Sequence, residues 1–173
     1  MGKQKKNILI SGLPGIGKTT LIKKICSEIK DKKPIGFYTE EIRNDGQRKG
    51  FHLIGLNGQR TIFAHILMET NHQVGKYKVD VDAFDKFLGS LDLINQPGKI
   101  IVIDEIGKME CLSNKFVSLI WSIMESDNPV VATISHTDGG IKGRIKQRDD
   151  VELFRMNLDN REKLLPEILN MLS

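Results

Sequence analysis

The sequence predicts an α/β protein in which a mostly parallel sheet is covered by helices on both faces and carries an antiparallel β-meander insertion. Two observations support this fold class. Short, almost continuously apolar runs alternate with segments of helical periodicity, which is typical of buried parallel strands joined by helices. Between residues 35 and 66, aromatic and β-branched segments are separated by short turns. Short turns favour antiparallel pairing, because parallel strands need longer crossovers. The meander is therefore either an insertion or an antiparallel edge of the parallel sheet.

The first half of the chain predicts a strand, a helix and then the meander. Residues 7–11 (NILIS) form a short apolar run that stops at a glycine, which indicates a buried strand. Residues 17–30 place apolar side chains at helical spacing, and Pro34 follows the expected end of that helix. NDGQ and NGQ are the turn signals of the meander. Its three strands are predicted at residues 35–43, 48–56 and 60–66.

The second half alternates helices with apolar strands. Helical spacing around residues 82–95 puts four large apolar residues on one face: Phe84, Phe87, Leu88 and Leu91. Ser113 is a suitable N-cap for a helix that runs to about Asp127. A C-terminal helix over residues 160–172 is expected to kink or restart at Pro166. Strands are predicted at residues 99–105, 129–135 and 151–157, whereas residues 67–79 carry no distinctive pattern.

Length and composition indicate an ordinary globular protein. No Pro/Gly/Ser-rich linker divides the 173 residues, so we expect one domain over 1–173 and, by default, a monomer. No window approaches the ~18 consecutive apolar residues of a membrane-spanning helix. The two distant cysteines, Cys26 and Cys111, favour a reducing, cytoplasmic compartment. The net charge of +4 suits a phosphate-rich ligand or weak, unspecific contact with RNA or DNA, but a chain of this size also reaches such a charge through a solvated lysine-rich surface alone.

The segment GLPGIGKTT matches the phosphate-binding pattern G-x-x-x-x-G-K-[ST] at every fixed position, between a predicted strand and a predicted helix. Its glycines let the backbone bend so that N–H groups point inward, and the helix adds its positive N-terminal end. Lys18 supplies a positive charge for the β- and γ-phosphates. The Thr19 hydroxyl supplies a ligand for Mg²⁺. The residues predicted to bind a nucleoside triphosphate here are Gly12, Leu13, Pro14, Gly15, Ile16, Gly17, Lys18, Thr19 and Thr20.

A pair of acids is expected at the end of the strand IIVIDE, because parallel sheets bind ligands outside the carboxyl ends of their strands. Asp104 is a suitable partner for the metal, since a carboxylate at the exit of a buried strand is costly without a cation nearby. Glu105 beside the γ-phosphate would hold and polarise water, which favours hydrolysis. The alternative interpretation of Glu105 is a surface acid at a strand end.

Four segments occur in the order LISGLPGIGKTTL, GFYTEEIRNDGQRKGF, IIVIDEIGKME and NREKLLPEIL. Together they resemble the thermophile-type nucleoside-triphosphatase family, which includes the vertebrate cancer-related nucleoside-triphosphatases, over nearly the whole chain. The resemblance implies a P-loop fold similar to the RecA/AAA branch. It also implies Mg²⁺-dependent hydrolysis of ATP, GTP, CTP and UTP with little base preference, with Asp104 on the metal and Glu105 on water. A second nucleotide-contacting stretch is implied at Val102, Ile103, Asp104, Glu105, Ile106, Gly107 and Lys108.

Other polar residues have two interpretations each. Lys108 either reaches a phosphate oxygen or is solvated. Ser135 and His136 follow an apolar strand and either sense the γ-phosphate or belong to an ordinary loop. Arg144 and Arg148 in IKGRIKQRDD either provide an arginine finger or lie on a solvated helix face. Glu40 and Glu41 of the meander either face the nucleotide or the metal or are paired surface acids, and Arg161 is interpreted as structurally paired.

Two other functions stay open beside hydrolysis. A small-molecule or nucleotide kinase fits the length and the phosphate-binding motif, but group transfer requires that water be excluded, and residues 67–98 hold no arginine cluster. A nucleotide-dependent switch or RNA-binding module fits the basic charge, although no aromatic RNA-binding motif is present. Phosphate release without an acceptor separates the hydrolase from the kinase.

Overall fold

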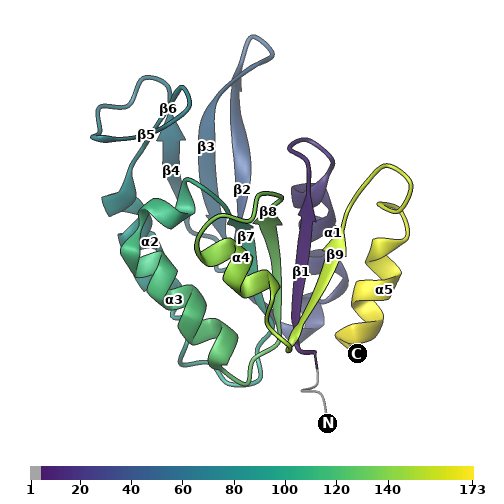
Figure 1. The fold of residues 1–173 in the computed structure, drawn as a ribbon. Helices are drawn as coiled ribbons and strands as arrows, with labels where there is room; N and C mark the ends of the chain where they lie inside the picture. The colour runs from purple at the N-terminus through teal and green to yellow at the C-terminus, as the bar shows by residue number, and fades with distance from the viewer. Residues whose placement is uncertain (1–4) are drawn as a thin grey trace.

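Nine strands form one mixed sheet in the computed structural model, which describes residues 5–173 (Figure 1). They are β1 (Asn7–Gly12), β2 (Ile35–Asn44), β3 (Gln47–Gly55), β4 (Arg60–His65), β5 (His72–Val74), β6 (Tyr77–Val79), β7 (Ile101–Ile106), β8 (Val130–Ser135) and β9 (Val151–Arg155). Their order across the sheet is β5-β6-β4-β3-β2-β7-β8-β1-β9. Strands β2, β7, β8, β1 and β9 are parallel, as predicted for the core of the fold. Residues 1–4 of the predicted domain lie outside the described part.

Helices cover both faces of this sheet. They are α1 (Lys18–Glu28), α2 (Val81–Leu91), α3 (Asn114–Glu125), α4 (Ile141–Lys146) and α5 (Leu164–Met171), with the short 3-10 helices η1 (Lys30–Lys32) and η2 (Glu110–Leu112). In Figure 1, α2, α3 and α4 lie on the viewer's side of the sheet, and α1 lies behind it. None of the helices between residues 5 and 173 has the length and the apolar content required to cross a bilayer.

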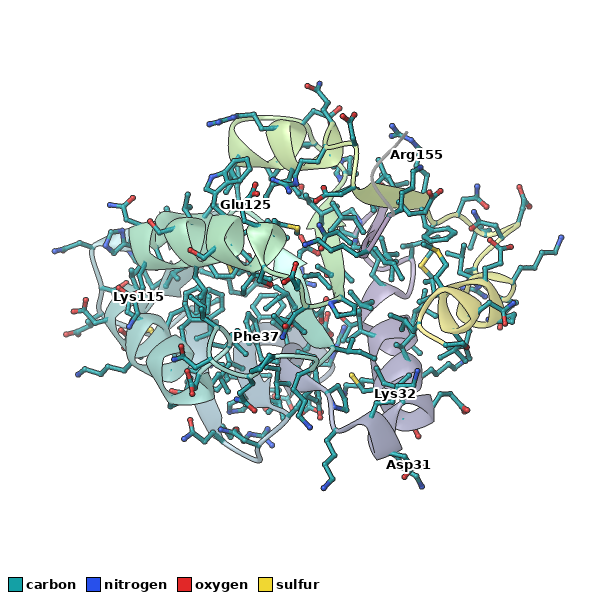
Figure 2. The ribbon with its side chains drawn as sticks, turned by 90° about the horizontal axis from the view of Figure 1, so that it is seen from below. Asp31, Lys32, Phe37, Lys115, Glu125 and Arg155 are labelled. Carbon is teal, nitrogen blue, oxygen red and sulfur yellow. The ribbon has the colours of Figure 1, made fainter. Side chains whose placement is uncertain are left out.

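The apolar residues form two clusters, one on each face of the sheet. Leu9 of β1 packs in the cluster under α2 and α3, whereas its neighbours Ile8 and Ile10 pack with α1 and α5. This alternation follows because successive side chains of a strand point to opposite faces. Phe37 of β2 contacts two phenylalanines of α2 edge-on, and it lies in the middle of the molecule in Figure 2. The predicted covering of both faces is confirmed.

The predicted three-stranded meander is confirmed by the antiparallel pairing of β2, β3 and β4. Because residues 35–37 of β2 also pair in parallel with β7, the meander forms an antiparallel edge of the same sheet. Residues 67–79, to which the sequence pattern assigns no role, contain β5 and β6. Strands of three residues are too short for an alternation to be recognised. The antiparallel part is therefore larger than predicted.

Local features set the ends of the helices, one as predicted and two at other positions. Ser113 caps α3 as predicted, because its Oγ accepts a backbone N–H of the first turn at 2.9 Å. Helix α2 stops short of residue 95 because Asp92 takes a left-handed φ of 44°. Helix α5 begins at Leu164, and Pro166 lies in its first turn, where a missing N–H removes no helical hydrogen bond.

Candidate active site

The P-loop, residues 12–19, joins the carboxyl end of β1 to the start of α1. Gly15 and Gly17 have φ angles of 78° and 112°, which residues with a side chain rarely adopt. The loop folds back on itself, so that the Ile16 N–H donates to the Leu13 carbonyl at 3.3 Å. The first turn of α1 presents its free N–H groups to the same place. This geometry suits the binding of an anion.

Lys18, the first residue of α1, is buried although it is charged, with only 8% of its surface exposed. Its Nζ donates to the carbonyl oxygens of Gly12 at 2.9 Å and Leu13 at 3.3 Å. Glu105 Oε2 lies 3.8 Å from the same nitrogen. Two neutral carbonyl groups and one carboxylate thus hold the ammonium at the P-loop, where a phosphate is a stronger partner than a carbonyl.

Asp104 is buried at the end of β7 and lies among three threonine side chains. Its Oδ2 accepts from Thr19 Oγ1 at 2.8 Å and from both the N–H and the Oγ1 of Thr39 at 3.3 Å. Its Oδ1 accepts from Thr133 Oγ1 at 2.6 Å. The two predicted metal ligands, Thr19 and Asp104, are therefore in direct contact. A hydroxyl beside a carboxylate is a set of hard oxygen donors, which fits Mg²⁺.

Glu105 follows Asp104 where the pairing of β7 with β8 shifts register, between Ile103 and Ile106. An irregularity of this kind changes the direction of side chains. Burial raises the pKa of Glu105, the positive charge of Lys18 opposes the rise, and the charge of Asp104 adds to it. A carboxylate with a raised pKa accepts a proton more readily near neutral pH. The structure thus brings both acids and Lys18 to one place.

A second glutamate, Glu110 in η2, lies next to Glu105, and no sequence pattern identified it. A side chain at position 107 would meet Glu105 Oε1 and Glu110 Oε2, each at 2.8 Å, so the two carboxyl groups converge on Gly107. Burial, followed by the charge of Glu105, raises the pKa of Glu110 to about 8. Glu110 therefore keeps its proton at neutral pH, which avoids a second buried negative charge beside Glu105.

The free energy of unfolding of the wild type is expected to fall as the pH rises, because of Glu110. In Glu110→Gln this fall should be absent. The folded chain keeps the Glu110 proton up to about pH 8, whereas the unfolded chain releases it near the ordinary value of 4.5. Stability therefore falls between these two values, because the folded state binds more protons there. At pH 8 we expect the melting temperature of the variant to exceed that of the wild type by several degrees. The conversion is about 2–4 °C for each kcal/mol of unfolding free energy in a chain of this size.

Thermal unfolding between pH 5 and pH 8 measures this difference. The matched control is Glu167→Gln, which changes an exposed glutamate of α5. Its pH profile is expected to follow the wild type. A Glu110→Gln profile parallel to that of the wild type would show that Glu110 is ionised in the folded chain at neutral pH.

The remaining residues of the second predicted stretch lie in different surroundings. Val102, Ile103 and Ile106 are fully buried in the two apolar clusters, so their side chains pack in the core. Lys108 is exposed. Of the whole stretch, Asp104 and Glu105 are the residues whose side chains meet Thr19 and Lys18 of the P-loop.

Two hollows adjoin the P-loop. The larger, of about 640 Å³, extends from Leu13 towards the ends of β8 and β9 and includes His136. The smaller, of about 310 Å³, lies between the start of α1 and the start of α5. Its polar lining residues are Thr20, Lys24, Arg161 and Glu162, all of them exposed.

The two arginines of the segment IKGRIKQRDD contact residues outside the P-loop. Arg148 pairs with Asp150 at 2.7 Å and with Glu125 at 2.5 Å, at the edge of the sheet where the parallel strands begin. Arg144 lies over the ring of Trp121 in α3, 4.9 Å from its centre. Neither arginine lines the two hollows beside the P-loop. The charges interpreted as paired have partners: Glu40 has Lys23 and Arg60, Glu41 has Arg43 and Arg48, and Arg161 has Glu162.

Comparisons with known proteins cover almost the whole chain. A family model described as NTPase matches residues 7–169. The chain is 45% identical over 166 residues to nucleoside-triphosphatase THEP1 of Thermotoga sp. (strain RQ2), covering 95% of this chain and 94% of that protein. It is 34% identical over 180 residues to the cancer-related nucleoside-triphosphatase of Homo sapiens, covering 95% of each.

Two solved structures are similar over the same extent. The crystal structure of THEP1 from the hyperthermophile Aquifex aeolicus has a TM-score of 0.87 and 36% identity, covering 96% of this chain and 99% of that chain. The solution structure of a human cancer-related nucleoside triphosphatase has a TM-score of 0.84 and 32% identity, covering 97% of each chain.

These matches extend far beyond the P-loop, a motif that many different protein families share. The family model begins at the first residue of β1 and ends in α5, so it includes the meander, Asp104 and Glu105. All four segments that carry the resemblance in the sequence lie within it. The chain belongs to the NTPase family.

Proposed function

We propose that this chain hydrolyses nucleoside triphosphates to nucleoside diphosphate and phosphate, with Mg²⁺ and with little preference for the base. The observation that supports it best is the contact of Thr19 with Asp104 at 2.8 Å, beside the Lys18–Glu105 pair at 3.8 Å. Four groups with different tasks in phosphoryl transfer thus meet at the end of one P-loop. The names of the relatives, nucleoside-triphosphatases, agree with this proposal.

The P-loop, Lys18 and Glu105 each have a different task in the proposed reaction. The P-loop N–H groups hold the phosphate chain, and the Lys18 ammonium exchanges its bonds to carbonyl oxygens for bonds to phosphate oxygens. A water oxygen then attacks the γ-phosphorus, the bond from phosphorus to the bridging oxygen breaks, and the nucleoside diphosphate leaves. The proton of the attacking water passes to Glu105, whose raised pKa favours its acceptance.

Thr19 and Asp104 are the residues that would hold the magnesium ion. When bound, the ion would neutralise negative charge on the β- and γ-phosphate oxygens. Thr39 and Thr133 hold the Asp104 carboxylate by hydrogen bonds, which fixes its orientation towards Thr19. Hydrogen bonds of this kind, to a carboxylate that ligates metal, preserve the geometry of the site.

Low base selectivity is supported by the smaller hollow. It adjoins Thr20, on the α1 side of the P-loop, which is where the nucleoside of a triphosphate bound by the loop is expected. Selective reading of a base requires buried polar groups that are left unpaired by the wrong base. Lys24, Arg161 and Glu162 are instead exposed side chains, which adapt to different bases.

We also propose a reducing, cytoplasmic location and a monomeric state. The location is supported by the two cysteines, Cys26 and Cys111, which are free thiols. Burial raises the pKa of each to about 11, so both stay protonated and unreactive.

Release of phosphate from ATP, GTP, CTP and UTP, with magnesium or with a chelator, tests the proposal. We expect release without any acceptor, loss of release with the chelator, and rates for the four nucleotides within about tenfold of each other. Release that required an added acceptor would favour the kinase. A rate that rose strongly with added RNA would favour the nucleic-acid-dependent switch. A hundredfold preference for one base would contradict the proposed tolerance.

A further inference from the structure

Lys142 is a buried lysine of α4 that has no role in the function proposed above. Only 8% of its surface is exposed. Its Nζ donates to Thr137 Oγ1 at 2.8 Å. It takes part in none of the ion pairs found within residues 5–173. A buried ammonium is costly unless it is paired with an anion. A neutral hydroxyl is a weak partner for it, so an anionic ligand would bind here with favourable energy.

The surroundings of Lys142 place it beside the P-loop. Its partner Thr137 Oγ1 lies 3.0 Å from Ser135 Oγ, and Ser135 is paired in register with Gly12 of the P-loop. Strands β8 and β1 are neighbours in the sheet, so the loop that follows β8 and leads to α4 lies beside the P-loop, which follows β1. Lys142 of α4 and Lys18 of α1 therefore belong to the two helices that follow these neighbouring strands at their carboxyl ends.

The loop in front of α4 is held without Lys142. A side chain at position 143 would meet the Asp138 carbonyl oxygen at 2.4 Å, so Gly143 allows the helix to lie directly on this loop. Lys146 donates to Asp138 Oδ1 at 2.7 Å and to the Thr137 carbonyl at 3.3 Å. The Lys142 ammonium can consequently exchange its hydroxyl partner for a phosphate oxygen while the loop stays in place.

We propose that Lys142 is a second cationic ligand of the terminal phosphate, which it contacts when a nucleoside triphosphate is bound, and that it stabilises the negative charge developing there during hydrolysis. This is the role of an arginine finger, one of the two interpretations that the sequence allows for Arg144 and Arg148 of the same segment. Lys142 exchanges no proton in this step. Its effect is electrostatic and is greatest as charge spreads over the phosphate oxygens. This inference rests on the proposed hydrolysis.

Lys142→Met tests the inference, because methionine keeps much of the apolar stem and removes the charge. We expect kcat to fall by about 10²- to 10³-fold, the usual effect of removing one group that stabilises charge in a transition state. Lys142→Arg is expected to recover part of the rate. The matched control is Arg144→Met, which removes a positive charge from an exposed position of the same helix and should change kcat by less than about fivefold. Thermal unfolding of each variant checks that it is folded.

A second measurement separates contact with phosphate from support of the loop. We compare the affinity for ADP with and without aluminium fluoride, which imitates the phosphoryl group in transfer. The wild type and Arg144→Met should bind ADP more tightly with the fluoride, and Lys142→Met should lose most of this gain. A folded Lys142→Met that keeps either its turnover or this gain would overturn the inference. A wild type that releases no phosphate at all would overturn the proposed function together with it.

Discussion

Lys18→Ala is expected to lower kcat/KM for nucleoside-triphosphate hydrolysis by about 10³-fold, the order of the loss when a charged group at a phosphoryl-transfer site is removed. Lys18 is nearly buried, and its ammonium lies within reach of both the P-loop carbonyls and Glu105. In this partly desolvated place its charge acts more strongly on a phosphate than a solvated charge does. Alanine leaves the site without that charge and leaves Glu105 beside a phosphate with one cation fewer.

Steady-state phosphate release and equilibrium binding of a non-hydrolysable triphosphate measure this effect. The matched control is Lys30→Ala, which removes an exposed lysine beyond the far end of α1. It is expected to leave both quantities unchanged. Melting temperatures show whether loss of the Lys18 bonds to Gly12 and Leu13 also affects folding. Wild-type turnover and wild-type affinity in Lys18→Ala would mean that the triphosphate does not bind along the P-loop.

The P-loop can be predicted from the sequence because its determinants lie within nine consecutive residues. The glycines set the backbone, and the strand before them and the helix after them are visible as an apolar run and a helical period. Asp104 and Glu105 can be predicted for a related reason. An acid at the end of an apolar strand lies at the carboxyl edge of the sheet whatever the order of the strands.

The groups around Asp104 depend on strand order, which no local pattern specifies. Thr39 and Thr133 are 65 and 29 residues from Asp104 in sequence, and they meet it because β2 and β8 flank β7. A hydroxyl residue within the apolar run VVATIS was a usable signal for Thr133, since a buried hydroxyl needs a partner. Thr39 has no such signal, because the sequence did not reveal that β2 pairs with β7 as well as with β3.

Charged residues were the hardest to assign, because their partners come from distant parts of the chain. In IKGRIKQRDD, the sequence favours Arg144 and Arg148 as candidates, because arginine is the usual cation that stabilises a phosphate during transfer. In the structure Arg148 pairs with Asp150 and Glu125, whereas the buried Lys142 contacts Thr137 in the loop that follows β8. Which residue of a short helix faces the site depends on how that helix lies on the sheet.

Glu105→Gln is expected to keep nucleotide binding and to lose turnover by about 10²- to 10⁴-fold, the range for removal of a general base. Glutamine has the same shape and still accepts a hydrogen bond from water, but it does not take up the proton that the attack releases. The wild-type rate should fall at acidic pH as Glu105 is protonated. In the variant this dependence should be absent, so that a pH profile distinguishes loss of a base from loss of structure.

Glu152→Gln is the matched control, because it makes the same change in β9, where Glu152 pairs with Lys5 on the surface. An exposed pair of this kind contributes about 0–1 kcal/mol to stability, so turnover and its pH profile should remain those of the wild type. Glu105→Gln and Lys18→Ala then separate two effects at one site. Loss of the base leaves an enzyme that still holds its triphosphate, whereas loss of the ammonium weakens both binding and turnover. If Glu105→Gln hydrolyses as fast as the wild type, another group activates the water, and Glu105 serves only as the partner of Lys18.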